Sequence, residues 1–425
     1  MKFDTAVIGG GFSGFAAAIS AAREGLKVIL IEKGNCMGGA ASNCLVQPFM
    51  PYVADINGEA VLLSRGIFEE ITDNFKKMYS DIDGVEITEK SLFLFNEEYM
   101  KVIFNQMAEE AGVTLLYHSY IIGAEMENGR VKSVKCSSTS GCFDIEADYF
   151  IDATGDANLA YICGYPFRLG RDSDNLCQPM TLCFRIANVD NDVCKNIPRD
   201  QINELYKRLQ KDGKITNPRE NVLIFPTLTD GVLHFNTTRI VKLNPTEPFD
   251  LTKAEIIARK QVMEIYLMLK RNIPGFENCK LIMTAPEIGI RESRMIVGEY
   301  TLTGEIMKSC KIFDDAIALG NYGIDIHSPD GTGTSYYFFK PGEYYTIPYR
   351  CLIPKNSENL LVAGRCISVD HEAQASMRIM PIVCTVGEAA GTAAAIAFKS
   401  GKNVSDIDIT LLRKTLKDNG AAVEI

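Results

Sequence analysis

The spacing of apolar residues near the start of the chain predicts two strands separated by a helix. Thr5–Ile8 is a short apolar run that ends in glycines, which is typical of a buried parallel strand. Phe15–Glu24 is rich in alanine and helical in pattern, and Gly25 suits a carboxyl-terminal cap. Lys27–Ile31 is a second apolar strand that ends at Glu32. These segments predict a complete β-α-β unit.

The later pattern continues this alternation at both ends of the chain and changes in the middle. Before residue 165 we expect a loop over Met37–Tyr52 and helices over Ala60–Met78 and Asn96–Ala111. Strands are expected over Val113–Tyr117 and Tyr149–Ala153, and between them a meander over Ile121–Met126, Arg130–Cys136 and Phe143–Ile145. The middle mixes helix candidates at Asp200–Lys211 and Lys253–Lys270 with short strands such as Val232–Thr237. Leu360–Ala363 is again an apolar strand, and Pro381–Lys399 is a helix rich in glycine and alanine. We therefore expect one α/β domain formed by both ends of the chain, with a second domain inserted between them.

Composition and charge narrow the classes of protein that fit. Of the 425 residues, 46% are hydrophobic and 23% are charged, which is the profile of a globular protein and not of a disordered one. The net charge of −10 weighs against binding to nucleic acid or to anionic membranes. No run reaches about 18 apolar residues without a charge, so we expect no membrane helix and a cytoplasmic location.

The 13 cysteines indicate reduced thiols and not a disulfide framework, because their number is odd and we identify no secretion signal. No two of them form C-x-x-C, so neither a zinc ribbon nor a thioredoxin-type pair is supported, and we predict no metal site.

The turn between the first strand and helix carries the pattern G-x-G-x-x-G through Gly9, Gly11 and Gly14. The first glycine makes the turn, the second lets the backbone approach a pyrophosphate, and the third lets helix and strand pack closely. Free N–H groups at the helix start favour phosphate. Glu32, at the end of the next strand, can accept hydrogen bonds from a ribose. The unit therefore predicts a dinucleotide site without choosing between NAD and FAD.

Further motifs give the chain a family resemblance. Glu32–Gly39 reads E-K-G-x-x-x-G-G, Ala153–Asp156 reads A-T-G-D, Arg291–Arg294 reads R-E-S-R, and Gly387–Gly391 reads G-E-A-A-G. Together with the first motif, they make the chain resemble the FAD-dependent oxidoreductases that have the glutathione-reductase-like FAD fold. The resemblance implies a Rossmann-like, three-layer FAD-binding domain with a parallel sheet and a β-meander. We place this domain at residues 1–165 and 345–425, and an inserted α+β substrate or cap domain at 166–344.

The same resemblance implies which residues hold FAD. They are Gly9, Gly11, Phe12, Ser13, Gly14, Glu32, Lys33, Gly38, Gly39, Ile121, Ala153, Gly155, Asp156, Gly364, Arg365 and Pro381. Many flavoproteins have Gly-Asp where this chain has Gly364-Arg365, so the arginine is expected to touch phosphate or the flavin edge instead. The helix at Pro381 is expected to turn its free N–H groups toward the flavin N1–C2=O region, where reduced flavin carries negative charge. Covalent attachment is not expected, since we favour packing roles for Cys36 and Cys44.

Two histidines are candidates for moving a proton. His371 lies in a predicted polar loop ten residues before Pro381, and it either carries a proton or contacts substrate. His327 and Asp325 belong to a predicted flexible loop, 325–333, of the inserted domain, of the kind that covers a flavin. We read His118, beside the predicted adenine-binding strand, as structural.

Three arginines are candidates for holding substrate. Arg378 is expected to bind an anionic substrate or the flavin, or to pair with Glu372. Arg291 and Arg294 would share one face if their segment is helical, where they serve either carboxylate recognition or an ion-pair network. A group of aromatic residues could line a substrate pocket or belong to the hydrophobic core, and we favour the core. Its members are Tyr336, Tyr337, Phe338, Phe339, Tyr344 and Tyr345.

The function that we predict is hydride transfer between a small organic substrate and flavin N5. One alternative is a reductase of activated C=C bonds resembling the fumarate-reductase group, and another is a flavin-bound component of RNA modification or assembly. The chain shows no second dinucleotide motif, so electrons would come from or go to a second substrate, diffusing NAD(P)H or a protein partner, none of which the sequence identifies. The oligomeric state stays open, with a homo-oligomer as one alternative.

Overall fold

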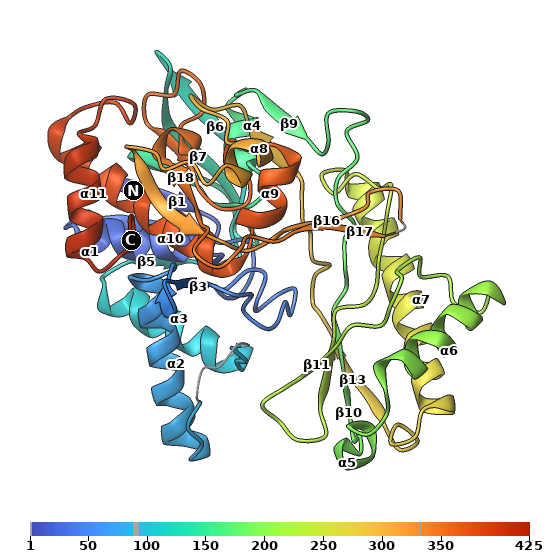
Figure 1. Ribbon diagram of the computed structural model, residues 1–425. Coiled ribbons are helices and arrows are strands. Elements are labelled where there is room, and N and C mark those ends of the chain that lie inside the picture. The colour runs from blue at the N-terminus through green and yellow to red at the C-terminus, as the bar shows by residue number, and fades with distance from the viewer. Residues whose placement is uncertain (1, 88–92, 332) are drawn as a thin grey trace.

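The chain folds into two bodies, a larger one that contains both termini and a smaller one built from the middle of the chain (Figure 1). The figure shows a computed structural model, which describes residues 2–87, 93–331 and 333–425. Each body has its own cluster of buried apolar side chains.

A seven-stranded sheet organises the larger body, in the order β5-β2-β1-β8-β7-β6 with β19 beside β8. Its strands are β1 (Lys2–Ile8), β2 (Val28–Ile31), β5 (Thr114–Leu116), β6 (Tyr120–Glu127), β7 (Arg130–Ser138), β8 (Gly141–Asp152) and β19 (Leu360–Val362). β5, β2, β1, the second half of β8 and β19 are parallel, whereas β6, β7 and the first half of β8 form an antiparallel meander. The predicted α/β class, with a parallel sheet and a meander, is confirmed.

The strands predicted at Phe143–Ile145 and Tyr149–Ala153 are in fact the single strand β8. Its residue Glu146 pairs with Ser133 of β7 on one side and with Lys2 of β1 on the other. The polar residues that suggested a break are the solvent-facing positions of one continuous strand, because side chains alternate between the two faces of a sheet.

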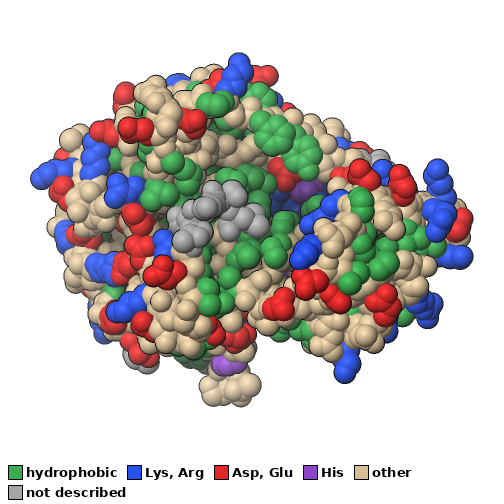
Figure 2. All heavy atoms as spheres, turned by 60° about the horizontal axis from the view of Figure 1, so that its bottom comes forward, with side chains coloured by type: hydrophobic (Ala, Val, Ile, Leu, Met, Phe, Trp, Pro, Cys, Tyr) green, Lys and Arg blue, Asp and Glu red, His purple; other side chains and the backbone are tan. Residues whose placement is uncertain are grey.

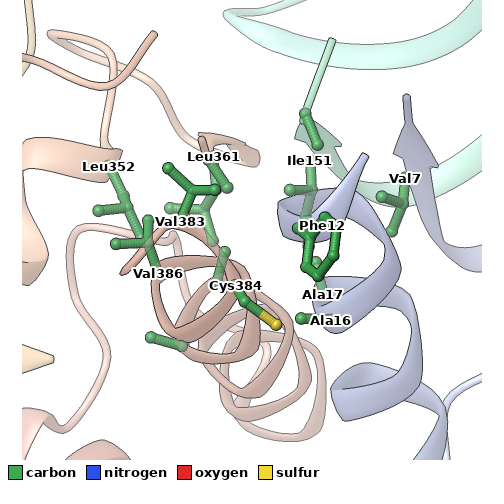
Figure 3. Packing of buried hydrophobic residues seen from close by; sticks show 14 of the residues in the cluster. Val7, Phe12, Ala16, Ala17, Ile151, Leu352, Leu361, Val383, Cys384 and Val386 are labelled. Atoms are coloured by element: carbon green, nitrogen blue, oxygen red, sulfur yellow. The ribbon is translucent and has the colours of Figure 1, made fainter. Parts of the chain in front are cut away.

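Helices α1 (Phe12–Arg23), α3 (Glu97–Glu110) and α10 (Met380–Ser400) pack directly on this sheet. Behind them, α2 (Ile67–Asp83) packs on α3 and α10, and α11 (Ile409–Asp418) packs on α10. α1 and α10 cross closely at two glycines of the G-E-A-A-G motif. A Cβ on Gly387 would lie 2.0 Å from the carbonyl oxygen of Ser13, and one on Gly391 would lie 2.1 Å from that of Ala17. Figure 3 shows Cys384 of α10 beside Ala16 and Ala17 of α1 at this crossing. The motif therefore sets the position of α10 against the amino-terminal unit.

The helix predicted over Ala60–Met78 begins later, at Ile67. The preceding residues form a hairpin of β3 (Val53–Ile56) and β4 (Glu59–Leu62), whose turn places Asn57 and Gly58 at positive φ. Asn-Gly is a strong hairpin signal. Gly66, at φ +64°, then precedes α2 directly. The predicted helix start was wrong because Asn57-Gly58 forms a hairpin turn there.

The smaller body is a four-stranded antiparallel sheet, in the order β11-β12-β10-β13, associated with three helices (Figure 1). Its elements are β10 (Phe184–Ala187), β11 (Ile224–Pro226), β12 (Leu233–Phe235), β13 (Lys280–Thr284), α5 (Asn191–Cys194), α6 (Arg199–Lys211) and α7 (Pro248–Asn272). The buried positions of α7 recur at helical spacing, among them Ala254, Ala258, Ile265 and Leu269.

The remaining elements lie between and beside the two bodies. They are α4 (Asn158–Ile162), β9 (Phe167–Leu169), β14 (Arg294–Ile296), α8 (Gly304–Lys308), β15 (Ala316–Gly320), β16 (Ile324–His327), β17 (Thr334–Tyr337), β18 (Tyr345–Pro348), the 3-10 helix at Tyr349–Leu352 and α9 (His371–Met377). The buried apolar residues of the smaller body run from Met180 to Ile288, with Leu45 added, and those from Met295 onward join the larger body. The domain boundaries at 165/166 and 344/345 stay a prediction.

By length and composition, α10 could cross a membrane, which the sequence analysis did not expect. However, 94% of its apolar window is buried inside the fold. A core helix has this composition for the same reason that a membrane helix does, since it is apolar on every face.

Candidate functional site

The glycine turn after β1 has the geometry that a pyrophosphate site requires. Gly9 adopts φ +100°, and a Cβ on it would lie 2.5 Å from the carbonyl oxygen of Ala153. A Cβ on Gly14 would lie 1.8 Å from the carbonyl oxygen of Gly9. Neither position can carry a side chain, because real Cβ atoms do not approach backbone so closely. The first and third glycines therefore serve the turn and the packing, as the motif predicts.

The second glycine of the motif is different, and it tests whether FAD fits. A Cβ on Gly11 would find no atom within 4 Å, and no side chain caps the start of α1. Ser13, in the first turn of α1, is 4% exposed, and its Oγ has no hydrogen-bond partner. Open space beside uncapped N–H groups and an orphaned hydroxyl is what a diphosphate would fill. The residues present fit the FAD diphosphate.

Glu32 is held in place at the end of β2. Its two carboxylate oxygens accept the backbone N–H groups of Gly10 and Gly34, at 2.6 and 2.7 Å. A carboxylate has about four acceptor positions, so Glu32 can still accept from ribose hydroxyls. Ile121, predicted to lie beside adenine, is a buried residue of β6.

The second glycine pair, Gly38-Gly39, packs directly on the first turn. The N–H of Gly38 donates to the carbonyl oxygen of Gly10 at 2.8 Å, and a Cβ on Gly39 would lie 3.0 Å from Cα of Gly11. Lys33 forms an ion pair of 3.0 Å with Glu287. This pair joins the loop that carries Gly38 and Gly39 to the segment that precedes R-E-S-R.

Three motifs meet at Asp156. Its Oδ1 accepts from Arg365 Nη2 and from Ser293 Oγ, each at 2.6 Å. Gly155, at φ +79°, makes room for this contact, since a Cβ there would lie 2.7 Å from Arg365 Nη1. Arg294 also binds here, through the carbonyl oxygen of Asp156 at 3.2 Å. Both of these hydrogen bonds use Oδ1, and among the described residues no hydrogen bond to Asp156 Oδ2 is found.

The amino-terminal end of α10 is open, as predicted. Pro381 lies in its first turn, and no side chain caps it. A Cβ on Gly364, at φ +101°, would lie 3.5 Å from Cβ of Ser13, so β19 ends beside the start of α1. The uncapped starts of α1 and α10 would thus hold opposite ends of the cofactor, diphosphate at α1 and flavin ring at α10.

Next to α10, the structure gathers three of the predicted catalytic residues, His327, Arg291 and Arg378. Arg378 directly follows α9 and lies two residues before α10. His327 ends β16, and it is a strand residue, not part of the flexible loop predicted over 325–333; within that loop, Thr332 lies outside the described residues. Figure 2 shows a hollow between the two bodies in which histidine, basic and acidic side chains gather.

His327 is bound through both ring nitrogens. Arg239 Nη2 lies 3.0 Å from Nδ1, and Asp325 Oδ2 lies 3.4 Å from Nε2. A guanidinium only donates, so Nδ1 accepts and Nε2 carries the proton. Burial, reinforced by the charge of Arg291, lowers the pKa of His327 to about 3. His327 is therefore a neutral ring that orients its neighbours.

Asp325 is the counter-charge of this region. Burial alone would raise its pKa, but the hydrogen bond to His327 and the charges of Arg378 and Arg291 lower it. Burial lowers the pKa of Arg291 to about 9, and the nearby charge of Arg378 acts in the same direction. The site therefore combines an ionised carboxylate with a guanidinium that gives up its proton more readily than usual.

His371 belongs to a separate pair. It is the first residue of α9, not part of a polar loop, and its Nδ1 lies 2.8 Å from Oε1 of the fully buried Glu292. Glu292 Oε2 accepts the backbone N–H of Gln178. His371 lines a cavity of about 440 Å³, together with Arg171 and the turn of the β16–β17 hairpin. A carboxylate at Nδ1 leaves Nε2 to exchange a proton with a molecule in that cavity.

The structure contradicts two predictions about arginines, the shared helical face of Arg291 and Arg294 and the pairing of Arg378 with Glu372. R-E-S-R is not helical, and Arg294 begins β14 with its guanidinium stacked 4.2 Å above the ring of Tyr161. Arg294 therefore lies apart from Arg291. Glu372 pairs with Lys308 at 2.6 Å, so it is not the partner of Arg378.

The thiols near the cofactor loop are not activated. Burial raises the pKa of Cys36 and raises that of Cys44 to about 12. A high thiol pKa disfavours the nucleophilic thiolate. Among the described residues, no group of three or more His, Cys, Asp or Glu side chains could hold a metal ion.

Comparison with known proteins decides the family. A family model described as FAD dependent oxidoreductase matches residues 4–416. The chain belongs to the FAD-dependent oxidoreductases. Within this family it is an enzyme that uses FAD, as the glycine cradle indicates.

Individual relatives are distant. The chain is 27% identical over 159 residues to a mitochondrial dihydrolipoyl dehydrogenase of Schizosaccharomyces pombe, covering 36% of this chain and 28% of that protein. A match to the Dictyostelium discoideum protein of the same name is 34% identical over 84 residues, covering 20% and 15%. The chain thus matches under a third of the length of these relatives.

Two solved structures are similar over most of the chain. A geranylgeranyl bacteriochlorophyll reductase-like protein from Thermoplasma acidophilum has a TM-score of 0.47 and 15% identity, covering 99% of this chain and 84% of that one. The p-nitrophenol 4-monooxygenase of Pseudomonas putida has a TM-score of 0.49 and 11% identity, covering 95% and 82%.

Sequence reasoning missed several residues of the site. Arg219 and Arg239 are almost fully buried, at 3% and 1% exposure, yet no motif or spacing marks them. Gln178 and Gln374 are buried amides that bridge the two halves of the site, with Nε2 of Gln178 donating to Oε1 of Gln374 at 3.0 Å. Among the residues of the His371 pair, only Glu292 lies in a motif that the sequence reveals, R-E-S-R.

Proposed function

We propose that this FAD-dependent oxidoreductase moves a hydride between a small organic substrate and flavin N5. When bound, FAD supplies the hydride acceptor or donor. The observation that carries the proposal is the pairing of His371 with Glu292 at the edge of a cavity of about 440 Å³, within one network with the arginines beside α10.

The network links the two halves of the site through amide side chains. Gln178 Nε2 donates to Gln374 Oε1, and Gln374 Nε2 donates to the carbonyl oxygen of Arg291 at 2.6 Å. The N–H of His327 donates to Gln178 Oε1 at 3.4 Å. In this proposal His371 exchanges the proton that accompanies hydride transfer, and Glu292 fixes its orientation. The arginines hold the substrate, and His327 positions Arg239.

Reduction of an activated C=C bond is a second candidate. The observation that favours it is Arg291, a half-buried guanidinium whose partners Pro179 and Thr181 are neutral and whose pKa burial lowers to about 9. Such a guanidinium can donate a proton more readily than an ordinary arginine. In this version Arg291, and not His371, supplies the proton to carbon.

Stopped-flow spectroscopy tests these proposals on the purified protein. The flavin absorbance is followed while the oxidised enzyme is mixed with hydroxy acids, amines or sugars, and while the reduced enzyme is mixed with enoates. We expect rapid bleaching or reoxidation by one class, and a loss of at least about 100-fold in rate for His371→Gln. His371→Gln with an unchanged rate, beside an inactive Arg291→Lys, would transfer the proton to Arg291. A purified protein that shows no flavin absorbance and releases no flavin on heating would overturn both candidates.

Partners and location follow from the same proposal. We propose a small-molecule substrate, a separate electron donor or acceptor, and a cytoplasmic enzyme that binds neither nucleic acid nor membrane. The net charge of −10 supports the absence of nucleic acid. RNA that co-purifies and is released by salt would instead favour a role in RNA modification or assembly.

A further inference from the structure

Four arginines from separate segments lie close enough for their charges to act on one another. Arg219 follows α6, Arg239 follows β12, Arg291 opens R-E-S-R, and Arg378 directly follows α9. The charges of the other three all act on Arg291. Four guanidinium groups within reach of one another repel, so the fold holds them together against their own electrostatics.

The carboxylates of the protein do not balance this cluster. Arg239 pairs with Glu220 at 2.8 Å, and Asp325 lies 3.4 Å from His327, where the charges of Arg378 and Arg291 also act on it. Among the described residues, Arg219, Arg291 and Arg378 have no carboxylate oxygen within 4 Å. Four positive charges against the two carboxylates therefore leave an excess of two.

The hydrogen-bonding capacity of the cluster is also unmet. Arg219 is 97% buried, and its Nη1 has no partner; its Nε reaches only the neutral Asn221, at 3.3 Å. Nε of Arg378 is likewise buried without a partner. Arg291 donates to neutral oxygens of Pro179, Thr181 and Asn236. Buried guanidinium donors without acceptors are rare in folded proteins and need an explanation.

We propose that this cluster is the substrate-binding site for a small organic dianion of the dicarboxylate class. The inference rests on the proposed function, since it names the substrate of the same site. Two carboxylates would neutralise the excess of two charges and supply bidentate acceptors for planar guanidinium groups. Arg219 and Arg378 have unused donors and bind the ligand directly. Arg239 is a positioning residue, because Glu220 and His327 already hold it.

The geometry explains why the uncompensated charge persists in the fold. An unpaired buried charge destabilises the protein, whereas the same charge paired with a ligand does not. The cluster would therefore be a preorganised anion site whose cost in stability is recovered on binding. His327, kept neutral between Arg239 and Asp325, adds no further positive charge and accepts from Arg239.

Isothermal titration calorimetry and thermal unfolding of the flavin-loaded enzyme test this proposal, with succinate, malonate and glutarate as probes. Succinamide, a neutral molecule of the same shape, is the ligand control. We expect a dicarboxylate to bind and to raise the unfolding temperature, while succinamide does neither. Arg378→Gln and Arg219→Gln should each weaken binding at least tenfold. Arg350→Gln, which removes a half-exposed arginine paired with Asp315, should bind as the wild type does.

The unliganded variants give a second readout that a merely structural arginine would not. Removing one repelling charge should leave the unfolding temperature of Arg378→Gln equal to or above that of the wild type. If Arg219→Gln fails to fold, Arg378→Gln alone decides. Equal binding of succinate and succinamide, or unchanged binding in Arg378→Gln, would overturn the proposal. Binding is scored separately from flavin bleaching, so dicarboxylates that bind without bleaching support the anion site and contradict only the proposed redox role.

Discussion

Asp156 and Arg365 lie 209 residues apart in sequence and form an ion pair of 2.6 Å between Oδ1 and Nη2. Ser293 donates to the same oxygen. The contact joins A-T-G-D, R-E-S-R and the end of β19 at one point. It also gives Arg365 its counter-charge, which Asp156 supplies from the loop after β8.

We expect Asp156→Asn to destabilise the protein by about 1–3 kcal/mol and to reduce flavin retention, because it leaves Arg365 without its counter-charge. Urea denaturation of Asp156→Asn, Arg365→Gln and the double variant measures the coupling between the two side chains. Asp174→Asn, which removes a carboxylate from an exposed ion pair with Arg171, is the control and should leave stability unchanged. Additive effects of the two substitutions would contradict the pairing.

The cofactor site could be predicted because its determinants are local. Gly9, Gly11 and Gly14 lie in one turn, and the acid at Glu32 follows one strand later. The steric demands of that turn exclude residues with side chains, so the requirement can be read from the glycine pattern in the sequence. The same holds for Gly387 and Gly391, whose spacing of four places both on the face that meets α1.

The substrate side could not be predicted, because its residues meet only through tertiary contacts. Arg219 and Arg239 come from irregular segments of the smaller body, and His327 of the β16–β17 hairpin links Arg239 to Asp325. Single charged residues at such positions look like ordinary surface charges in the sequence. Even Arg294, three residues from Arg291, points elsewhere because β14 is a strand and not a helix.

We expect Gly11→Ala to fold and yet bind FAD at least tenfold more weakly, a change of about 1.4 kcal/mol. A Cβ at Gly11 meets no protein atom within 4 Å, so it would occupy the space for the diphosphate. Flavin-to-protein absorbance after gel filtration and thermal unfolding of the flavin-free fraction check this. Gly14→Ala is the contrast, because its Cβ would clash with Gly9 and should prevent folding. Full flavin occupancy in Gly11→Ala would place the diphosphate elsewhere.

Glu388 should make the protein less stable as the pH rises. It is 2% exposed, accepts the N–H of Ile67 at 3.1 Å, and burial raises its pKa to about 8. Between about pH 4.3 and 8 the folded state then holds more protons than the unfolded state, so the free energy of unfolding falls with pH. Relative to wild type, Glu388→Gln should gain about 1 kcal/mol per pH unit across this window. Urea denaturation of both proteins at pH 5, 6.5 and 8 gives the difference. A difference that stays constant with pH would show that Glu388 is ionised throughout.

His234 should make the protein less stable as the pH falls. It is fully buried on β12, neither ring nitrogen has a partner, and burial together with the charge of Arg185 lowers its pKa to about 3. Between about pH 3 and 6.5 the unfolded state binds the extra proton, so stability is lost as the pH falls. His234→Leu removes this titration and two unsatisfied polar atoms. It should therefore stabilise the protein by about 1 kcal/mol at pH 8 and by roughly a further 1 kcal/mol per pH unit below 6.5. His118→Asn, at an exposed residue whose positive φ asparagine tolerates, is the control and should follow the wild-type curve. If His234→Leu and wild type lose stability in parallel on acidification, the buried ring is not the source of the acid sensitivity.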